Sequence, residues 1–142
     1  MLDLDHFKSF NDTHGHNGGD FILRKFGKVL QATIRGGDIA CRYGVEEFAV
    51  LMVDCPPDGG PKRAEEIRSA TEKLTRDYHG TILDGVTTSI GMATSPRDAG
   101  SLDELIIRAD AALYVVKKAG RNRISTHSRI SENQAIEVVS AA

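Results

Sequence analysis

The sequence predicts an α+β fold in which helices cover a single, mainly antiparallel sheet. Two features of its 142 residues lead to this prediction. Segments whose apolar residues recur at helical spacing alternate with short runs rich in β-branched and aromatic residues. Two of these runs lie only a few residues apart, as antiparallel neighbours joined by a tight bend do. The expected order is strand, helix, helix, hairpin, helix, strand, helix, strand, without an internal repeat.

The chain is expected to begin with a short strand and two helices. Residues 1–4 alternate apolar side chains with an acid, which predicts a strand. A helix over 5–14 follows, and the glycine-rich stretch 15–19 is expected to interrupt it. Asp20 is expected to be the N-cap of a second helix, which Gly36 and Gly37 stop.

The next elements form a predicted β-hairpin. Residues 39–43 and 48–53 favour pleated, half-buried surfaces, and the sequence RYGVEEF at 42–48 joins them. A two-residue type II′ turn needs glycine only at its first central position, so Gly44 and Val45 are expected to form that turn.

The second half of the chain predicts a helix, a strand, a helix and a last strand, over residues 62–78, 86–94, 101–118 and 123–126. Ser101 and Glu104 form a capping box at the start of the second of these helices. We assign residues 1–126 to one domain and 127–142 to a tail whose end has no clear partner.

Composition restricts the classes of function. The chain is 40% apolar and 27% charged, as in ordinary globular domains, and its formal net charge of −2 argues against a general nucleic-acid or anionic-membrane surface. A small phosphate ligand stays possible. Cys41 and Cys55 read as reduced thiols, and no apolar run reaches transmembrane length, so we expect a cytoplasmic domain without direct membrane contact.

Several carboxylates suggest a metal site, although each has a simpler interpretation as a solvated turn or cap residue. Asp3 and Asp5 form an acid-x-acid pair at a strand end, and Mg²⁺ prefers such hard oxygen ligands. Glu46 joins them if the sheet brings the bend beside Asp3. Glu46 and Glu47 are adjacent in an extended segment and point to opposite sides, so only one is expected to face a given metal.

Other polar residues suit a purine nucleotide. Lys8, Lys117 and Arg121 are candidate phosphate contacts, although basic residues at a helix end often only favour the macrodipole. Asn11 and Asp20 offer the donors and acceptors that a guanine edge requires, although each can equally be an ordinary helix or cap residue.

Five ordered motifs resemble the GGDEF domain of diguanylate cyclases, with a degenerate signature, GVEEF. They are LDLDHFKSFNDTHGHNGGD at 2–20, RGGD at 35–38, RYGVEEF at 42–48, TTSIGMA at 87–93 and RADAALYVVKKAGRNR at 108–123. The resemblance implies a palm-type, ferredoxin-like nucleotidyl cyclase core with a five-stranded sheet. It also implies that two domains meet face to face, each with GTP and two Mg²⁺ ions, and release cyclic di-GMP and pyrophosphate.

The resemblance also assigns residues by position. It implies that the Asp3 and Glu46 carboxylates and the Leu4 carbonyl bind metal, and that Glu47 and Lys8 take part in catalysis. The implied substrate contacts are Asn11 and Asp20 to guanine, Gly44 at the bend, and Lys8, Lys117 and Arg121 to the triphosphate.

RGGD matches the inhibitory site at which the family's product binds back. Arg35 would offer its planar guanidinium to guanine or phosphate, and Asp38 would accept from guanine. A second arginine for this site stays open between Arg63 and Arg68.

Two departures from the family pattern affect the expected activity. Val45 replaces the second glycine of the signature, so a branched side chain stands where nucleotide would lie against bare backbone. The family also has a helix and a DxLTGLxNR segment before this point, so relative to the family the chain is N-terminally truncated and Asp3 is expected near a frayed end.

Three functions therefore stay open: an active cyclase, a degenerate domain that binds cyclic di-GMP or GTP, or a dimerising module. A homodimer and an upstream sensor or receiver domain are the partners that the resemblance implies, and we expect turnover weakened by Val45.

Overall fold

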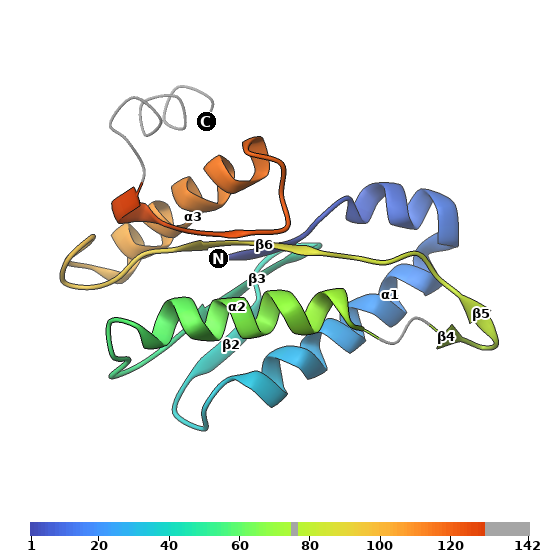
Figure 1. Ribbon diagram of the computed structural model, residues 1–142, viewed down its shortest axis with the longest axis horizontal. Coiled ribbons are helices and arrows are strands. Elements are labelled where there is room, and N and C mark those ends of the chain that lie inside the picture. Colours follow the sequence, from blue (N-terminus) through green and yellow to red (C-terminus); the bar gives the residue numbers. More distant parts are fainter. Residues whose placement is uncertain (75–76, 130–142) are drawn as a thin grey trace.

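A five-stranded sheet forms the centre of the domain (Figure 1). The computed structural model describes residues 1–74 and 77–129. The strands run in the order β2-β3-β1-β6-β7, and every neighbouring pair is antiparallel except β6 and β7. Their bounds are β1 Leu2–Leu4, β2 Ile39–Arg42, β3 Glu47–Leu51, β6 Thr88–Met92 and β7 Ile124–Thr126. The expected α+β class and mainly antiparallel sheet are confirmed.

Helices cover both faces of this sheet. Figure 1 shows α1 (Phe7–Thr33) and α2 (Gly59–Glu72) on one side and α3 (Leu102–Lys118) on the other, followed by the short 3-10 helix η1 (His127–Arg129). Strand β1 shows why both faces are covered. Its Leu2 and Leu4 belong to the main core with α1 and α2, whereas Met1 packs with Ala109 and Leu113 of α3. Alternation along the strand thus places apolar side chains in two layers.

Helix α1 contains the expected interruption, but it is confined to Gly15, the first residue of the glycine-rich stretch. A single kink at Gly15, with φ 73° and ψ 166°, divides it, and helical structure resumes before Asp20. Asp20 is therefore an exposed residue inside the helix and not its N-cap. Gly19 is buried, and a Cβ there would collide with the Asn11 side chain. Gly15 thus makes the predicted break, whereas Gly19 allows close packing within the helix that follows.

A small hairpin replaces the expected end of α2. That helix ends at Glu72, and β4 (Asp77–Tyr78) pairs with β5 (Thr81–Ile82). The connecting His79 and Gly80 both have positive φ, 52° and 82°, as the tight hairpin turn of type I′ requires. The carboxylate of Asp77 accepts a hydrogen bond of 2.8 Å from the Gly80 N–H. The prediction of helix through residue 78 is therefore wrong, because this turn stabilises a hairpin.

The packing of α3 on β6 predicts a position that tolerates no side chain. A Cβ at Gly91 would overlap the backbone of Ala109 and Leu113, so α3 would have to move off the sheet. We expect Gly91→Ala to lower the free energy of unfolding by about 3 kcal/mol, measured by urea denaturation.

A matched control for this substitution lies in α1, where a Cβ at Gly27 has open space around it. Gly27→Ala should raise the free energy of unfolding, by up to about 1 kcal/mol, because alanine favours helix. Equal effects of the two substitutions would contradict the close approach of α3 to β6.

Candidate nucleotide and metal site

The bend of the β2–β3 hairpin lies beside β1, as the sequence predicted. Asp3 pairs with Glu47 across the sheet, and the Leu4 N–H donates to the Glu46 carbonyl at 3.1 Å. Strand β1 is also paired on its other side, where Asp3 lies opposite Ser89 of β6. The expected fraying at Asp3 is therefore wrong, because this short strand is the middle strand of the sheet.

The bend itself differs from the expected two-residue turn. The N–H groups of Tyr43 and Gly44 both donate to the Glu47 carbonyl, at 2.8 and 3.1 Å, which leaves Gly44, Val45 and Glu46 as the loop. Neither Gly44 nor Val45 has positive φ, so the type II′ assignment is wrong. A Cβ at position 44 would come close to the Glu47 side chain, which would have to shift to make room for it.

Arg42 holds the bend from the strand that precedes it. Its Nε donates to the Gly44 carbonyl at 3.1 Å and its Nη2 to the Val45 carbonyl at 2.6 Å. The Val45 side chain is 67% exposed. The hairpin therefore accommodates valine in the signature. Any effect of Val45 is expected on a ligand that binds at the bend and not on the fold of the hairpin.

Asp3 lies in a buried and charged environment beside the bend. Its side chain is 8% exposed, and Lys117 of α3 donates to its Oδ2 at 2.6 Å. Burial raises the pKa of Asp3, Lys117 opposes that shift, and the nearby Glu46 and Glu47 carboxylates raise the pKa further. The carboxylates of Asp3, Glu46 and Glu47 thus lie near one another, and their combined negative charge favours a bound cation.

The donors in this region decide whether it fits a metal ion. Within residues 1–74 and 77–129, no three His, Cys, Asp or Glu side chains gather closely enough to hold a metal by themselves. The expected set needs only two carboxylates, Asp3 and Glu46, with the Leu4 carbonyl. Lys117 binds only one oxygen of Asp3, Oδ2, so the other oxygen, Glu46 and the Leu4 carbonyl are the donors for a cation whose remaining ligands would be phosphate oxygens.

The raised pKa of Asp3 predicts that its carboxylate lowers the stability of the fold at neutral pH. A carboxyl whose pKa is raised by folding destabilises the fold above that pKa and has no such effect below its ordinary range. We therefore expect Asp3→Asn to be more stable than the wild type at about pH 7, with the difference shrinking towards about pH 4. Urea denaturation at both pH values measures this. A wild type that is the more stable at neutral pH would show that pairing with Lys117 outweighs burial.

Asp5, the second acid of the acid-x-acid pair, is engaged differently. Its Oδ1 accepts from Ser89 at 2.7 Å, and its Oδ2 accepts from the Thr87 hydroxyl at 2.6 Å and from the Asn122 N–H at 3.0 Å. It is 4% exposed. Both oxygens are occupied by hydroxyl and amide donors, so Asp5 does not have the surroundings of a metal ligand.

The two expected guanine contacts lie on either side of the kink in α1. The Asn11 Oδ1 atom is buried and has no hydrogen-bond partner among the described residues, so its capacity to accept a hydrogen bond is unused. Asp20 lines a shallow pocket with Leu23, Arg24, Arg42 and Phe48. Asp20 thus faces the hairpin that carries the bend, and no hydrogen bond joins it to Asn11 within the described part of the chain.

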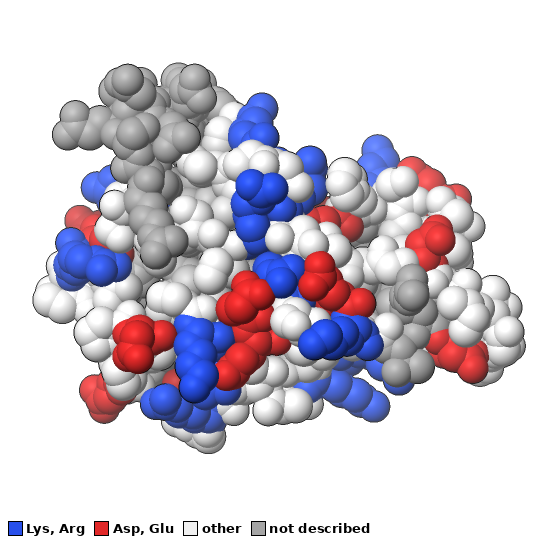
Figure 2. Space-filling view, viewed as in Figure 1, with Lys and Arg blue, Asp and Glu red and all other residues white. Residues whose placement is uncertain are grey.

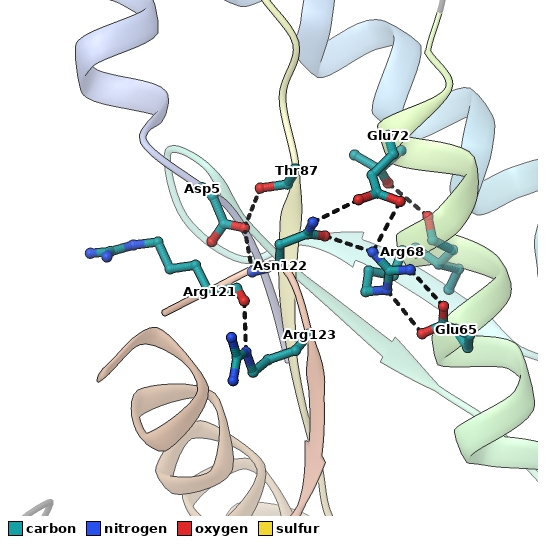
Figure 3. A network of polar contacts seen from close by, with 10 residues as sticks. Asp5, Glu65, Arg68, Glu72, Thr87, Arg121, Asn122 and Arg123 are labelled. Atoms are coloured by element: carbon teal, nitrogen blue, oxygen red, sulfur yellow. Dashed lines mark hydrogen bonds and ion pairs between the residues drawn. The ribbon is translucent and has the colours of Figure 1, made fainter. Parts of the chain in front are cut away.

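The basic candidates occupy different positions. Lys117 binds Asp3, and Lys8 is exposed in the first turn of α1. Arg121 follows α3 in a left-handed conformation with φ 61°, and its guanidinium extends away from the polar network (Figure 3). On the face shown in Figure 2, Lys and Arg are interspersed with Asp and Glu and form no patch of one sign.

RGGD forms the connection between α1 and β2, at the opposite end of β2 from the bend. The Arg35 N–H donates to the Asp38 carboxylate at 2.9 Å, and the Asp38 N–H donates to the Arg35 carbonyl at 3.0 Å. On α2, Arg63 pairs with Glu66, whereas Arg68 is held by Glu65 and Glu72.

Sequence reasoning missed the residues that hold these groups in place. Arg42 and Asn122 received no role, Arg68 was considered only as a candidate second arginine of the inhibitory site, and Asp5 was considered only as a possible metal ligand. Asn122 lies inside the RADAALYVVKKAGRNR motif, which was the available signal.

Comparison with known proteins identifies the family. The family described as "Diguanylate cyclase, GGDEF domain" matches residues 1–123. Diguanylate cyclase A of Treponema denticola is 39% identical over 125 residues, which are 88% of this chain and 33% of that protein. Diguanylate cyclase VdcA of Vibrio cholerae is 43% identical over 126 residues, which are 87% of this chain and 37% of that protein.

Solved structures agree with the sequence matches. The GGDEF domain of DgcB from Caulobacter crescentus, in complex with c-di-GMP, has a TM-score of 0.81 at 37% identity, covering 89% of this chain and 75% of that one. The active GGEEF domain of a diguanylate cyclase from Vibrio cholerae has a TM-score of 0.81 at 28% identity, covering 92% and 81%.

The fold, the bend beside Asp3 and these matches define a nucleotidyl cyclase domain. The chain belongs to the GGDEF domain family of diguanylate cyclases, which acts in cyclic di-GMP signalling. It spans about a third of the length of the two cyclases named above. None of the helices within residues 1–74 and 77–129 combines the length and apolar character needed to cross a bilayer.

Proposed function

We propose that this domain binds GTP with Mg²⁺ at the bend and converts it slowly to cyclic di-GMP, its turnover weakened by Val45. The observation that carries the proposal is the placement of the Glu46–Glu47 bend against Asp3. Solved relatives include one described as an active GGEEF domain of a diguanylate cyclase.

In this proposal different residues of the site bind the metal ion, the guanine base and the phosphates. Asp3, Glu46 and the Leu4 carbonyl would hold Mg²⁺, which neutralises charge that builds on the phosphates. Asn11 and Asp20 bind the guanine edge, and Lys8, Lys117 and Arg121 bind the triphosphate. Glu47 lies near the reacting 3′-hydroxyl. That hydroxyl attacks the α-phosphate of a second GTP and releases pyrophosphate.

The reaction needs two such domains facing one another, so we propose a homodimer at least in the reacting state. An upstream sensor or receiver domain and a cytoplasmic location are part of the same proposal. The domain is proposed to extend over 1–126, followed by a tail at 127–142 whose residues 130–142 lie outside the described part.

Incubation with GTP and Mg²⁺, followed by separation of the nucleotides, tests the proposal. We expect slow formation of cyclic di-GMP and its loss in Asp3→Asn, which removes a ligand charge. The absence of both product and GTP binding would contradict the proposal.

The position of the RGGD segment supports a second function, the binding of cyclic di-GMP without catalysis. RGGD lies at the other end of β2 from Val45, so damage at the bend does not reach it. The DgcB relative is described as a GGDEF domain in complex with c-di-GMP. If turnover is absent, the domain would act as a cyclic di-GMP or GTP binding module.

A further inference from the structure

The loop after α3 has an unusual backbone at the point where it carries Arg121. Gly120, Arg121 and Asn122 all have positive φ, 106°, 61° and 46°. For residues with side chains this conformation costs about 1 to 2 kcal/mol each, so two in succession require stabilisation from the surroundings. We call residues 120–122 the left-handed turn.

Hydrogen bonds from Asp5, α3 and Arg123 provide part of that stabilisation (Figure 3). The Asn122 N–H donates to the buried Asp5 carboxylate after β1, which also accepts from the Thr87 hydroxyl just before β6. The Arg121 N–H donates to the Val116 carbonyl of α3 at 3.1 Å, and Arg123 donates to the Arg121 carbonyl at 2.9 Å.

Helix α2 holds the same turn from the other side. Arg68 Nη1 donates to the Asn122 side-chain oxygen at 2.8 Å, and the Asn122 amide donates to Glu72 at 2.6 Å. Arg68 is itself fixed by two hydrogen bonds to Glu65, of 2.9 and 2.7 Å. Asn122 is therefore held through its main chain by Asp5 and through its side chain by α2.

We propose that Asp5 is a positioning residue: it anchors the left-handed turn through Asn122 and so aims Arg121 at the triphosphate of bound GTP. The inference rests on the proposed nucleotide site. Asp5, Arg68 and Glu72 are all engaged within the network, whereas the Arg121 guanidinium points out of it (Figure 3). The buried Asp5 carboxylate thus fixes one side of the left-handed turn, and the Arg121 guanidinium projects from the other side.

Nucleotide affinity separates this role from a general role in stability. In calorimetric titrations with Mg²⁺, Asp5→Asn should lower the affinity for a GTP analogue with a methylene bridge between its α and β phosphates about tenfold. The affinity for GMP, which lacks the outer phosphates, should change by less than about twofold. In an Arg121→Ala background, Asp5→Asn should have no further effect.

Ser89→Ala is the matched control, because Ser89 donates to the other oxygen of the same carboxylate and does not touch the turn. It should leave both affinities unchanged. Equal loss of analogue and GMP affinity in Asp5→Asn would overturn the inference in favour of a role in stability alone.

Amide hydrogen exchange gives a readout that needs no nucleotide. In Asp5→Asn the Asn122 amide should exchange about ten- to a hundredfold faster, while the amides of β6 stay protected. A wild type that binds no nucleotide would overturn the proposed function, and exchange at Asn122 would still decide whether Asp5 holds the turn. Faster exchange without any change in analogue affinity would overturn the aiming of Arg121.

Two further substitutions cover the case in which Asp5→Asn does not fold. Asn122→Ala disfavours the left-handed backbone and removes the contacts to α2, whereas Asn122→Gly removes only those contacts. The alanine variant should lose more analogue affinity than the glycine variant. Equal losses would show that left-handed geometry does not matter for Arg121.

Discussion

Replacing Val45 with glycine is expected to raise the rate of cyclic di-GMP synthesis a few hundredfold. Val45 lies at the bend and is 67% exposed, and in the proposed site nucleotide would approach this side of the bend. Removal of about 3 to 4 kcal/mol of unfavourable contact in the transition state would produce this change. The measurement is the initial rate with GTP and Mg²⁺ for both proteins at equal concentration.

The structure indicates that Val45→Gly should leave the backbone of the bend unchanged. Arg42 binds the carbonyls of Gly44 and Val45, which both proteins have, so the bend should keep its shape. Val45→Ala should give an intermediate rate, and Glu47→Gln in the Val45→Gly background should remove the gain. Rapid synthesis by the wild type would show that the valine does not obstruct the nucleotide.

Cyclic di-GMP is expected to bind the RGGD turn whether or not the bend is active. Guanine presents paired donors to a carboxylate and acceptors to a guanidinium, so loss of either partner should cost about 1.5 to 3 kcal/mol, or roughly ten- to a hundredfold in affinity. Calorimetric titration of the wild type, Arg35→Ala and Asp38→Ala with cyclic di-GMP measures this.

Conservative variants separate recognition from the shape of the turn. Asp38 accepts from the Arg35 N–H, and Asp38→Asn keeps an acceptor for that bond while removing the charge. Arg35→Lys keeps the charge and removes the planar pair of donors. Both should bind weakly. Unchanged binding in all four variants would place the ligand elsewhere, and Asn11→Ala would then test the nucleotide pocket.

Much of the domain was predictable because the relevant interactions are local. The N-cap of α3 is an example: the Ser101 hydroxyl accepts from the Glu104 N–H at 3.3 Å, although the Glu104 carboxylate accepts from the Gly100 N–H and not from Ser101 as a full capping box requires. The hairpin strands were likewise predicted from neighbouring residues, and their register places the bend where the motif order required it. Propensity, capping and side-chain period act over a few residues, so the sequence expresses them directly.

Other features depend on contacts that form only when the sheet assembles. The sequence could not separate the roles of Asp3 and Asp5, which are two acids of one short motif. Lys117 reaches Asp3 across 114 positions of the chain, and Asn122 reaches Asp5 across 117. The sequence by itself determined that two carboxylates stand at the end of β1. Only the tertiary structure decided that one meets a lysine beside the bend and the other a buried set of donors, because burial and charge depend on neighbours that are distant in sequence.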